Sequence, residues 1–209
     1  MSFDISWIAS ADISITQLEQ RLGLSRTGRT SPKLDFDYAS VSLTDGWSLV
    51  IANRVDYLET LDLASLSAEG HIVTLALHDG IMVSVAESWI NRQRDWRVLL
   101  DGQKHIEHLD VSGGLPEHFA AAKSKCEGAI RSQVPAPSGA NVPTMPPSER
   151  AIFERMGLKV TPVGVAPQKV DFHFEVPIDL THSIVGFRQD QPPRGLNYYE
   201  LRRNGDPSK

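Results

Sequence analysis

The chain contains a single cysteine, Cys126, among its 209 residues. One cysteine excludes a disulfide within the chain, and such sparing use is typical of proteins in a reducing compartment. The amino-terminal segment has no Lys or Arg before Arg21 and no long apolar run, so it lacks the features of a secretion signal. No run of 18 apolar residues is present that would predict a membrane-spanning helix. These absences predict a cytoplasmic protein without a membrane partner and indicate no cofactor.

The chain also lacks a strong excess of charge of either sign. Its 21 Lys and Arg residues are scattered among 26 Asp and Glu residues, which gives a net charge of −5. A broad nucleic-acid-binding face needs clustered basic residues, so the pattern argues against a nucleic-acid partner. The hydrophobic share of 41% is close to the average of globular proteins, and a chain of this length buries a core without disulfides or metals.

The clearest pattern lies in the centre of the chain, between about residues 71 and 111. Apolar segments of six to ten residues alternate there with short turns, at Asp79-Gly80, in the five-residue stretch 91–95 and at Asp101-Gly102. Such closely spaced strands pair with their neighbours and form an antiparallel meander. A period of two places Trp96, Val98 and Leu100 on one face of this sheet.

The segments before the meander predict a short helix and a hairpin. Ser14 and Gln17 form a capping box for a helix that ends before Gly23, and the polar segment 25–35 predicts a loop. Residues 37–43 and 47–53 then form a hairpin around Asp45-Gly46. We therefore expect an α+β fold, in which a hairpin and an antiparallel meander pack against a few short helices.

The carboxyl-terminal part begins with a helix over residues 115–131, whose apolar stripe includes Phe119 and Cys126. The sequence then predicts a core domain over 1–131, a Pro-rich linker or long loop over 132–147, and a helix-strand-helix segment with a polar tail over 148–209. In the last segment we expect a strand over 169–176 and a helix over 178–187. This segment is small for a separate domain, so the strand around Phe172 is a candidate to return to the main sheet.

No established catalytic or metal-binding motif is present, although five of the seven histidines lie near the meander. His78, His105 and Glu107 from neighbouring strands are the candidates for a site, with Asp110 as a further carboxylate. The chain has neither an HExxH motif nor a ligand pair with metal-site spacing, so we predict scattered histidines and no metal.

The sequence disfavours two kinds of candidate nucleophile. Cys126 lies in mid-helix on the apolar stripe, which favours a buried core residue. Ser84, Ser88 and Ser112 lie near carboxylates or histidines, but none occupies a G-x-S-x-G turn between a strand and a helix.

Two aromatic and basic patches are candidates for binding. Trp89 and Trp96 flank the predicted loop 91–95, which carries Arg92 and Arg94, and Trp and Arg dominate protein-binding hot spots. The alternative is one Trp in the core and two solvated arginines. The tail offers a second aromatic and basic patch, which contains Tyr198, Tyr199, Arg202 and Arg203. Stacking on nucleic acid is the candidate role of this patch, and its short length disfavours that role.

The leading hypothesis is a non-enzymatic protein-binding module, such as an inhibitor or an immunity-type protein that neutralises a toxin. The alternative is a small-molecule or metal-dependent enzyme that uses His78, His105, Glu107 and Asp110.

Overall fold

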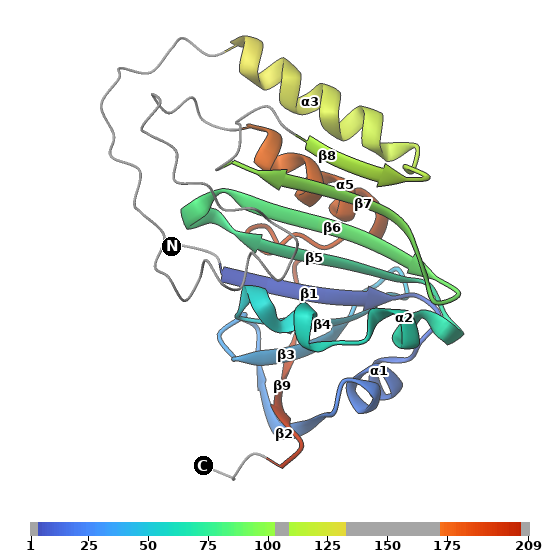
Figure 1. Cartoon of the computed structure of the whole chain (residues 1–209). Helices are drawn as coiled ribbons and strands as arrows, with labels where there is room; N and C mark the ends of the chain where they lie inside the picture. The colour runs from blue at the N-terminus through green and yellow to red at the C-terminus, as the bar shows by residue number, and fades with distance from the viewer. Residues whose placement is uncertain (1–3, 103–108, 133–171, 206–209) are drawn as a thin grey trace.

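The computed structural model describes residues 4–102, 109–132 and 172–205, and its centre is a nine-stranded antiparallel sheet (Figure 1). The strand order is β2-β9-β3-β4-β1-β5-β6-β7-β8. The strands are β1 (Asp4–Ser10), β2 (Leu24–Ser31), β3 (Tyr38–Ser42), β4 (Ser48–Ala52), β5 (Ile72–His78), β6 (Val83–Ile90), β7 (Gln93–Asp101), β8 (Leu109–Gly113) and β9 (Tyr198–Arg203). The α-helices are α1 (Ile15–Arg21), α2 (Leu63–Leu66), α3 (His118–Ser132) and α5 (Glu175–Val185). The short 3₁₀ segments are η1 (Val55–Thr60), η2 (Ser67–Glu69), η3 (Asp79–Ile81) and η4 (Phe172–Phe174). The predicted α+β class is confirmed.

Local signals in the first half of the chain produce the expected elements. The capping box forms before α1: the Ser14 hydroxyl accepts from the Gln17 backbone N–H, and the Gln17 side chain accepts from the Ser14 N–H. The predicted hairpin is the β3–β4 pair, in which Ser42 lies opposite Ser48. The predicted meander is the consecutive run β5-β6-β7-β8.

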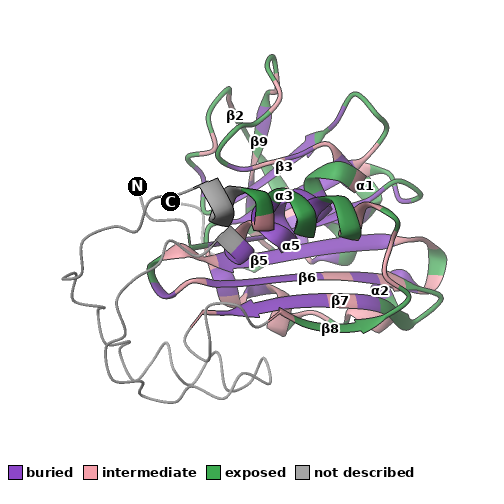
Figure 2. Ribbon diagram, turned by 90° about the horizontal axis from the view of Figure 1, so that it is seen from above, coloured by how far each residue is buried: buried purple, intermediate pink, exposed green. Residues whose placement is uncertain are grey.

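The two faces of the sheet are buried under different helices. Trp96, Val98 and Leu100 belong to the main core under α3 and α5, which confirms the predicted alternation along β7. Leu99 points to the opposite face, where α1, α2 and η1 cover two smaller apolar clusters. We call the face under α3 and α5 the helix face, and the face under α1, α2 and η1 the opposite face. Figure 2 shows that the strands in the middle of the sheet are buried along most of their length, while β8 is largely exposed.

The predicted polar loop over 25–35 is wrong, because residues 24–31 form the edge strand β2. Its partner is β9, and Leu24 pairs with Arg203, which lies 179 positions later in the chain. An edge strand with solvent on one side needs little apolar alternation, so its sequence resembles a loop. The tail predicted to be only polar therefore contains a strand of the main sheet.

The predicted five-residue loop over 91–95 is also wrong. Asn91 and Arg92 alone form the turn, with φ angles of 51° and 67°, and β7 begins at Gln93. Two-residue hairpin turns match the twist of the strands, and Asn tolerates the left-handed conformation. As a result Arg94 lies in a strand, and only Arg92 remains at the tip.

The expected strand around Phe172 is a third error. Residues 172–174 are η4, and α5 starts at Glu175, three residues before the start of the helix predicted over 178–187. Phe174 and Val176 point into the main core, so packing of the helix outweighs the alternating pattern of this segment. Most of the predicted linker 132–147 and the elements predicted up to residue 171 lie outside the described residues. In the described part of the chain, no helix is long and apolar enough to cross a membrane.

Candidate partner-binding surface

The opposite face of the meander carries a cluster of polar and aromatic side chains around Glu87. The Glu87 carboxylate accepts a hydrogen bond of 2.9 Å from the Trp89 indole N–H and one of 3.1 Å from Arg94 Nη1. Arg97 Nε lies 3.2 Å from the same carboxylate. The Arg94 guanidinium also lies 5.9 Å from the centre of the Trp89 ring. One carboxylate thus holds a tryptophan and an arginine by hydrogen bonds and pairs with a second arginine.

The pairing of β6 and β7 explains why these side chains meet. Glu87 lies directly opposite Arg97, and Trp89 follows Glu87 on the same face because side chains alternate along a strand. The register shifts between Ser88 and Trp89, and this irregularity places Arg94 opposite Trp89. Without the shift, the arginine would lie on the other face.

The cluster is open to solvent on its outer side. The Arg94 side chain is 43% exposed, whereas Glu87 beneath it is only 14% exposed. Trp89 is half-buried against the apolar cluster under α1 and α2, and Ile90 beside it is exposed. Arg92 at the tip donates its backbone N–H to the Ser67 hydroxyl at 3.1 Å, which ties the hairpin to η2. We call Glu87, Trp89, Arg92, Arg94 and Arg97 the Trp–Arg surface.

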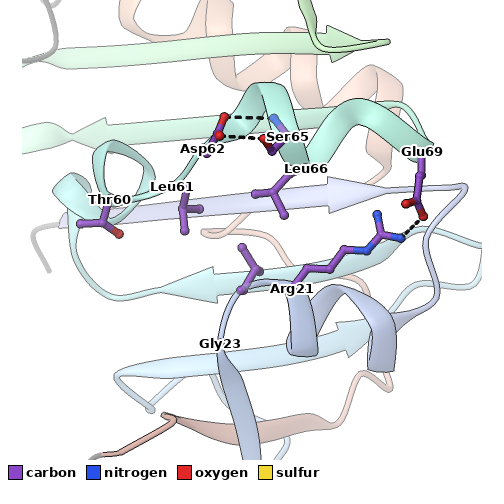
Figure 3. Close-up of a pocket in the computed structure, with 9 residues that line it drawn as sticks. Arg21, Gly23, Thr60, Leu61, Asp62, Ser65, Leu66 and Glu69 are labelled. Atoms are coloured by element: carbon purple, nitrogen blue, oxygen red, sulfur yellow. Dashed lines mark hydrogen bonds and ion pairs between the residues drawn. The ribbon is translucent and has the colours of Figure 1, made fainter.

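A pocket of about 520 Å³ lies between the end of α1 and the segment from η1 to η2 (Figure 3). Leu22, Leu61 and Leu66 form its apolar part. Leu22 and Leu66 belong to the same apolar cluster on which Trp89 packs. The pocket and the Trp–Arg surface are therefore connected through α2 and η2 on one side of the molecule.

The rim of this pocket is charged. Arg21 pairs with Glu69 across one end, and Asp62 accepts hydrogen bonds from the Ser65 N–H and hydroxyl at 3.0 and 2.7 Å (Figure 3). The hydrogen bonds from Ser65 hold the pKa of Asp62 below its usual value, so this carboxylate stays ionised. Two carboxylates and one guanidinium make the rim acidic overall.

The structure brings together three of the four residues predicted for binding. Trp89, Arg92 and Arg94 lie at the same hairpin, whereas Trp96 is 4% exposed and points into the main core on the other face. The prediction that one Trp is in the core is thus confirmed, but Arg94 is paired as well as solvated.

Glu87 and Arg97 were missed by the sequence reasoning. Glu87 and Trp89 are two residues apart in a predicted strand, so the alternation rule already placed them on one face. The opposing position of Arg97 depends on the turn, which was predicted three residues too long.

The histidines and carboxylates of the enzyme hypothesis do not converge where they are described. His78 ends β5 and Asp110 lies on β8, with β6 and β7 between them. Three strand spacings separate them by about 14 Å. His105 and Glu107 lie outside the described residues. Within the described ranges, no group of three or more His, Cys, Asp or Glu side chains is placed to hold a metal ion.

A serine and a histidine do meet, but away from solvent. His71 Nε2 lies 2.8 Å from the Ser88 hydroxyl, and Ser88 is fully buried. Burial lowers the pKa of His71, with Asp12 and Asp95 opposing the shift. Ser84 is also fully buried and donates its hydroxyl to the Phe174 carbonyl at 2.9 Å. A substrate cannot reach either hydroxyl, so these contacts stabilise the sheet and its helix.

A second pocket, of about 240 Å³, lies between α3 and α5 and is lined by ion-paired side chains. Arg188 pairs with Glu175, Asp179 and Asp190, and Lys125 reaches Asp179 at 2.7 Å. These pairs link the two helices to the loop after α5. Cys126 beside them is 3% exposed, and burial raises the pKa of its thiol to about 11, as expected for a core residue and not for a nucleophile.

The aromatic residues of the carboxyl-terminal patch already contact other residues of the sheet. Tyr198 is buried in the main core. The Arg26 guanidinium lies 3.9 Å from the Tyr199 ring centre, and Arg203 lies over the rings of Tyr38 and Tyr57. A nucleic-acid base that stacks on Tyr199 would have to displace Arg26. Arg202 is exposed.

The Trp–Arg surface and the adjoining pocket have to be interpreted from their own chemistry. No family model, no curated protein and no solved structure matches this chain.

Proposed function

We propose that this chain is a non-enzymatic protein-binding module that inhibits or neutralises a protein partner, in the manner of an immunity protein that blocks a toxin. The observation that carries the proposal is the convergence of Trp89, Arg94 and Arg97 on the single Glu87 carboxylate. Trp and Arg are the residue types that contribute most to protein-binding hot spots. The partner would therefore bind at the Trp–Arg surface.

The Glu87 contacts favour tight binding because they order the side chains before a partner arrives. Immobilising a long side chain at an interface costs about 0.5–1.5 kcal/mol. Trp89 and Arg94 already contact Glu87 and each other, so much of this cost falls on folding and not on binding. The Arg94 side chain is still partly exposed and can donate to a carboxylate or a carbonyl of the partner.

The adjoining pocket supports a basic protein as the partner. Its leucine-lined part accepts an apolar side chain or the stem of a long one, while Asp62 and Glu69 lie at its rim. The chain as a whole carries a net charge of −5, which speeds the approach of a positively charged protein. We place this interaction in the cytoplasm, which suits the free and buried Cys126.

The test begins with the protein as bait in a lysate of its native cell, with bound proteins identified by mass spectrometry. Wild type is compared with the double variant Arg92→Ala, Arg94→Ala and with Arg29→Ala, whose side chain is 72% exposed on β2. A specific partner is retained by wild type and by Arg29→Ala and is lost from the double variant.

The identified partner is then purified and titrated by calorimetry. We expect Trp89→Ala to weaken binding by about 2 kcal/mol or more, the range of a hot-spot residue. The partner's own activity is measured with and without this chain, and inhibition is expected. Equal binding by wild type and both hairpin variants would remove the Trp–Arg surface from the proposal, and an unchanged partner activity would remove the inhibitory role.

A further inference from the structure

In the part of the chain that the structure describes, the edge of the sheet at β8 is exposed and lacks basic residues, proline and a bulge. Asp110, Val111, Ser112 and Gly113 are exposed, and the Val111 side chain belongs to the few large apolar groups at the described surface, at 41% exposure. The strand contains no Lys, Arg or Pro, and its register with β7 runs without a bulge. Edge strands are normally protected by such features, because every second residue points its N–H and C=O outward.

We propose that β8 pairs with β8 of a second copy of this chain, antiparallel and centred on Val111, so that two nine-stranded sheets join into one. This inference concerns a different surface from the proposed function and does not depend on it. A two-fold axis through the Val111 pair makes the interface isologous, the commonest arrangement in homodimers.

The sequence of β8 is complementary to itself in this register. Val111 lies opposite the partner subunit's Val111, and Asp110 lies opposite the partner subunit's Ser112. The apolar pair lies on the helix face, and a hydroxyl meets a carboxylate on the opposite face, both favourable cross-strand pairs. A shift of the register by two residues would place the two Asp110 carboxylates opposite each other, which is unfavourable. The sequence thus disfavours this shifted register.

Charge complementarity extends across the joint on the opposite face. Glu87, Arg97 and Ser112 are successive cross-strand neighbours on β6, β7 and β8. In the proposed pairing, the next position in this row is the partner subunit's Asp110. Two strand spacings of about 4.8 Å separate Arg97 from that carboxylate, with only the small Ser112 between them. An arginine side chain can span this gap, so each Arg97 gains a second carboxylate.

α3 lies on the helix face, out of the plane of the sheet (Figure 2). The strand has five residues, which makes the contact short. Interfaces at the low end of the size range are weak, so we expect a dimer with a dissociation constant in the micromolar range.

Sedimentation equilibrium of the purified full chain over the micromolar range tests the pairing. Wild type should show a concentration-dependent monomer–dimer equilibrium. Val111→Lys and, separately, Asp110→Arg should raise the dissociation constant by about tenfold or more, since each brings like charges together across the joint. Thr30→Lys, an exposed position on the other edge strand, serves as the matched control and should dimerise like wild type.

Circular dichroism melting checks that each variant is folded, and hydrogen exchange supplies a second measurement on wild type alone. The backbone amides of β8 should exchange more slowly as the protein concentration rises. A protein that is monomeric at every concentration overturns the proposal. A dimer that both β8 variants leave unchanged overturns it equally, because the contact then lies elsewhere.

Discussion

The two edges of the sheet differ in how they meet solvent. At one edge, β2 carries Arg26 and Arg29, and its pairing with β9 breaks between Arg26 and Thr30 around Gly28. Bulges and charged side chains both discourage another strand from docking. At the other edge, β8 is regular, has no basic residue and exposes Val111. The β2 edge is therefore built to stay unpaired, and the β8 edge is suited to pairing.

The two edges also use their glycines differently. Gly28 on β2 has a φ of +90°, and a Cβ built on it would meet no atom within 4 Å. Gly113 at the end of β8 has a φ of +86°, and a Cβ there would lie 1.9 Å from the Asp95 carbonyl oxygen. The glycine of the bulge supplies only a backbone conformation, whereas the glycine of β8 also permits two backbones to approach closely.

The largest expected effect comes from exchanging these glycines for alanine. Gly113→Ala should lower the free energy of unfolding by about 3 kcal/mol or more, because strand β7 must move away from the new methyl group. Gly28→Ala should lower it by only about 1 kcal/mol, the cost of a positive φ for alanine. Urea unfolding followed by circular dichroism measures both values.

If the two glycine variants lose the same free energy of unfolding, the β7 and β8 backbones can move apart in Gly113→Ala without cost. The contrast between the edges would then rest on charge and bulge alone. An intact fold with faster exchange of the β8 amides in Gly113→Ala would instead localise the damage to this edge, in agreement with the comparison.

A second and smaller effect is expected from two ion pairs of the β2 edge, the buried carboxylate of Glu19 with Arg26 and the more exposed pair of Glu200 with Arg29. Glu19 is buried, accepts from the Ser40 hydroxyl at 2.6 Å and pairs with Arg26. Glu19→Ala should cost about 2 kcal/mol, because it leaves a buried hydroxyl and a partly buried guanidinium without their acceptor. Glu200→Ala removes the pair with Arg29, whose side chain is mostly exposed, and an exposed hydrogen bond from the Thr27 hydroxyl, and it should cost about 0.5 kcal/mol. Thermal melts rank the two, and the reverse order would show that the outer network holds this edge.

How far the fold could be predicted follows the same division between centre and edge. The meander was predictable because its apolar segments and turns are local, and each strand pairs with the next one in sequence. Strand β2 was not, because it is polar along most of its length and its partner β9 lies at the far end of the chain. Nothing in a polar edge strand distinguishes it from a loop until its partner is known.

The candidate site was predictable only in part, for a geometric reason. The composition around residues 89–96 indicated the Trp–Arg surface, and alternation would have added Glu87. The position of Arg94 depends on a two-residue turn and on the register shift after Ser88, and a change of one residue in either moves a side chain to the other face. Hairpin register is therefore the step at which reasoning from sequence failed here.

The smallest expected effect concerns the centre of the sheet, between the two edges. His71 lies beside the fully buried Ser88 and against the Trp47 ring, and burial lowers its pKa from the usual 6.5. Because folding lowers the pKa of this histidine, the unfolded chain binds a proton more readily than the folded chain does. The contribution of His71 to stability is therefore complete above the unfolded pKa and is lost as the pH falls below about 6.5. The free energy of unfolding of wild type should thus decline between pH 7.5 and about 5.5, and His71→Gln, which keeps a hydrogen-bonding side chain, should show a shallower decline. Identical pH profiles for the two proteins would mean that groups at the edges, and not this central histidine, govern the response.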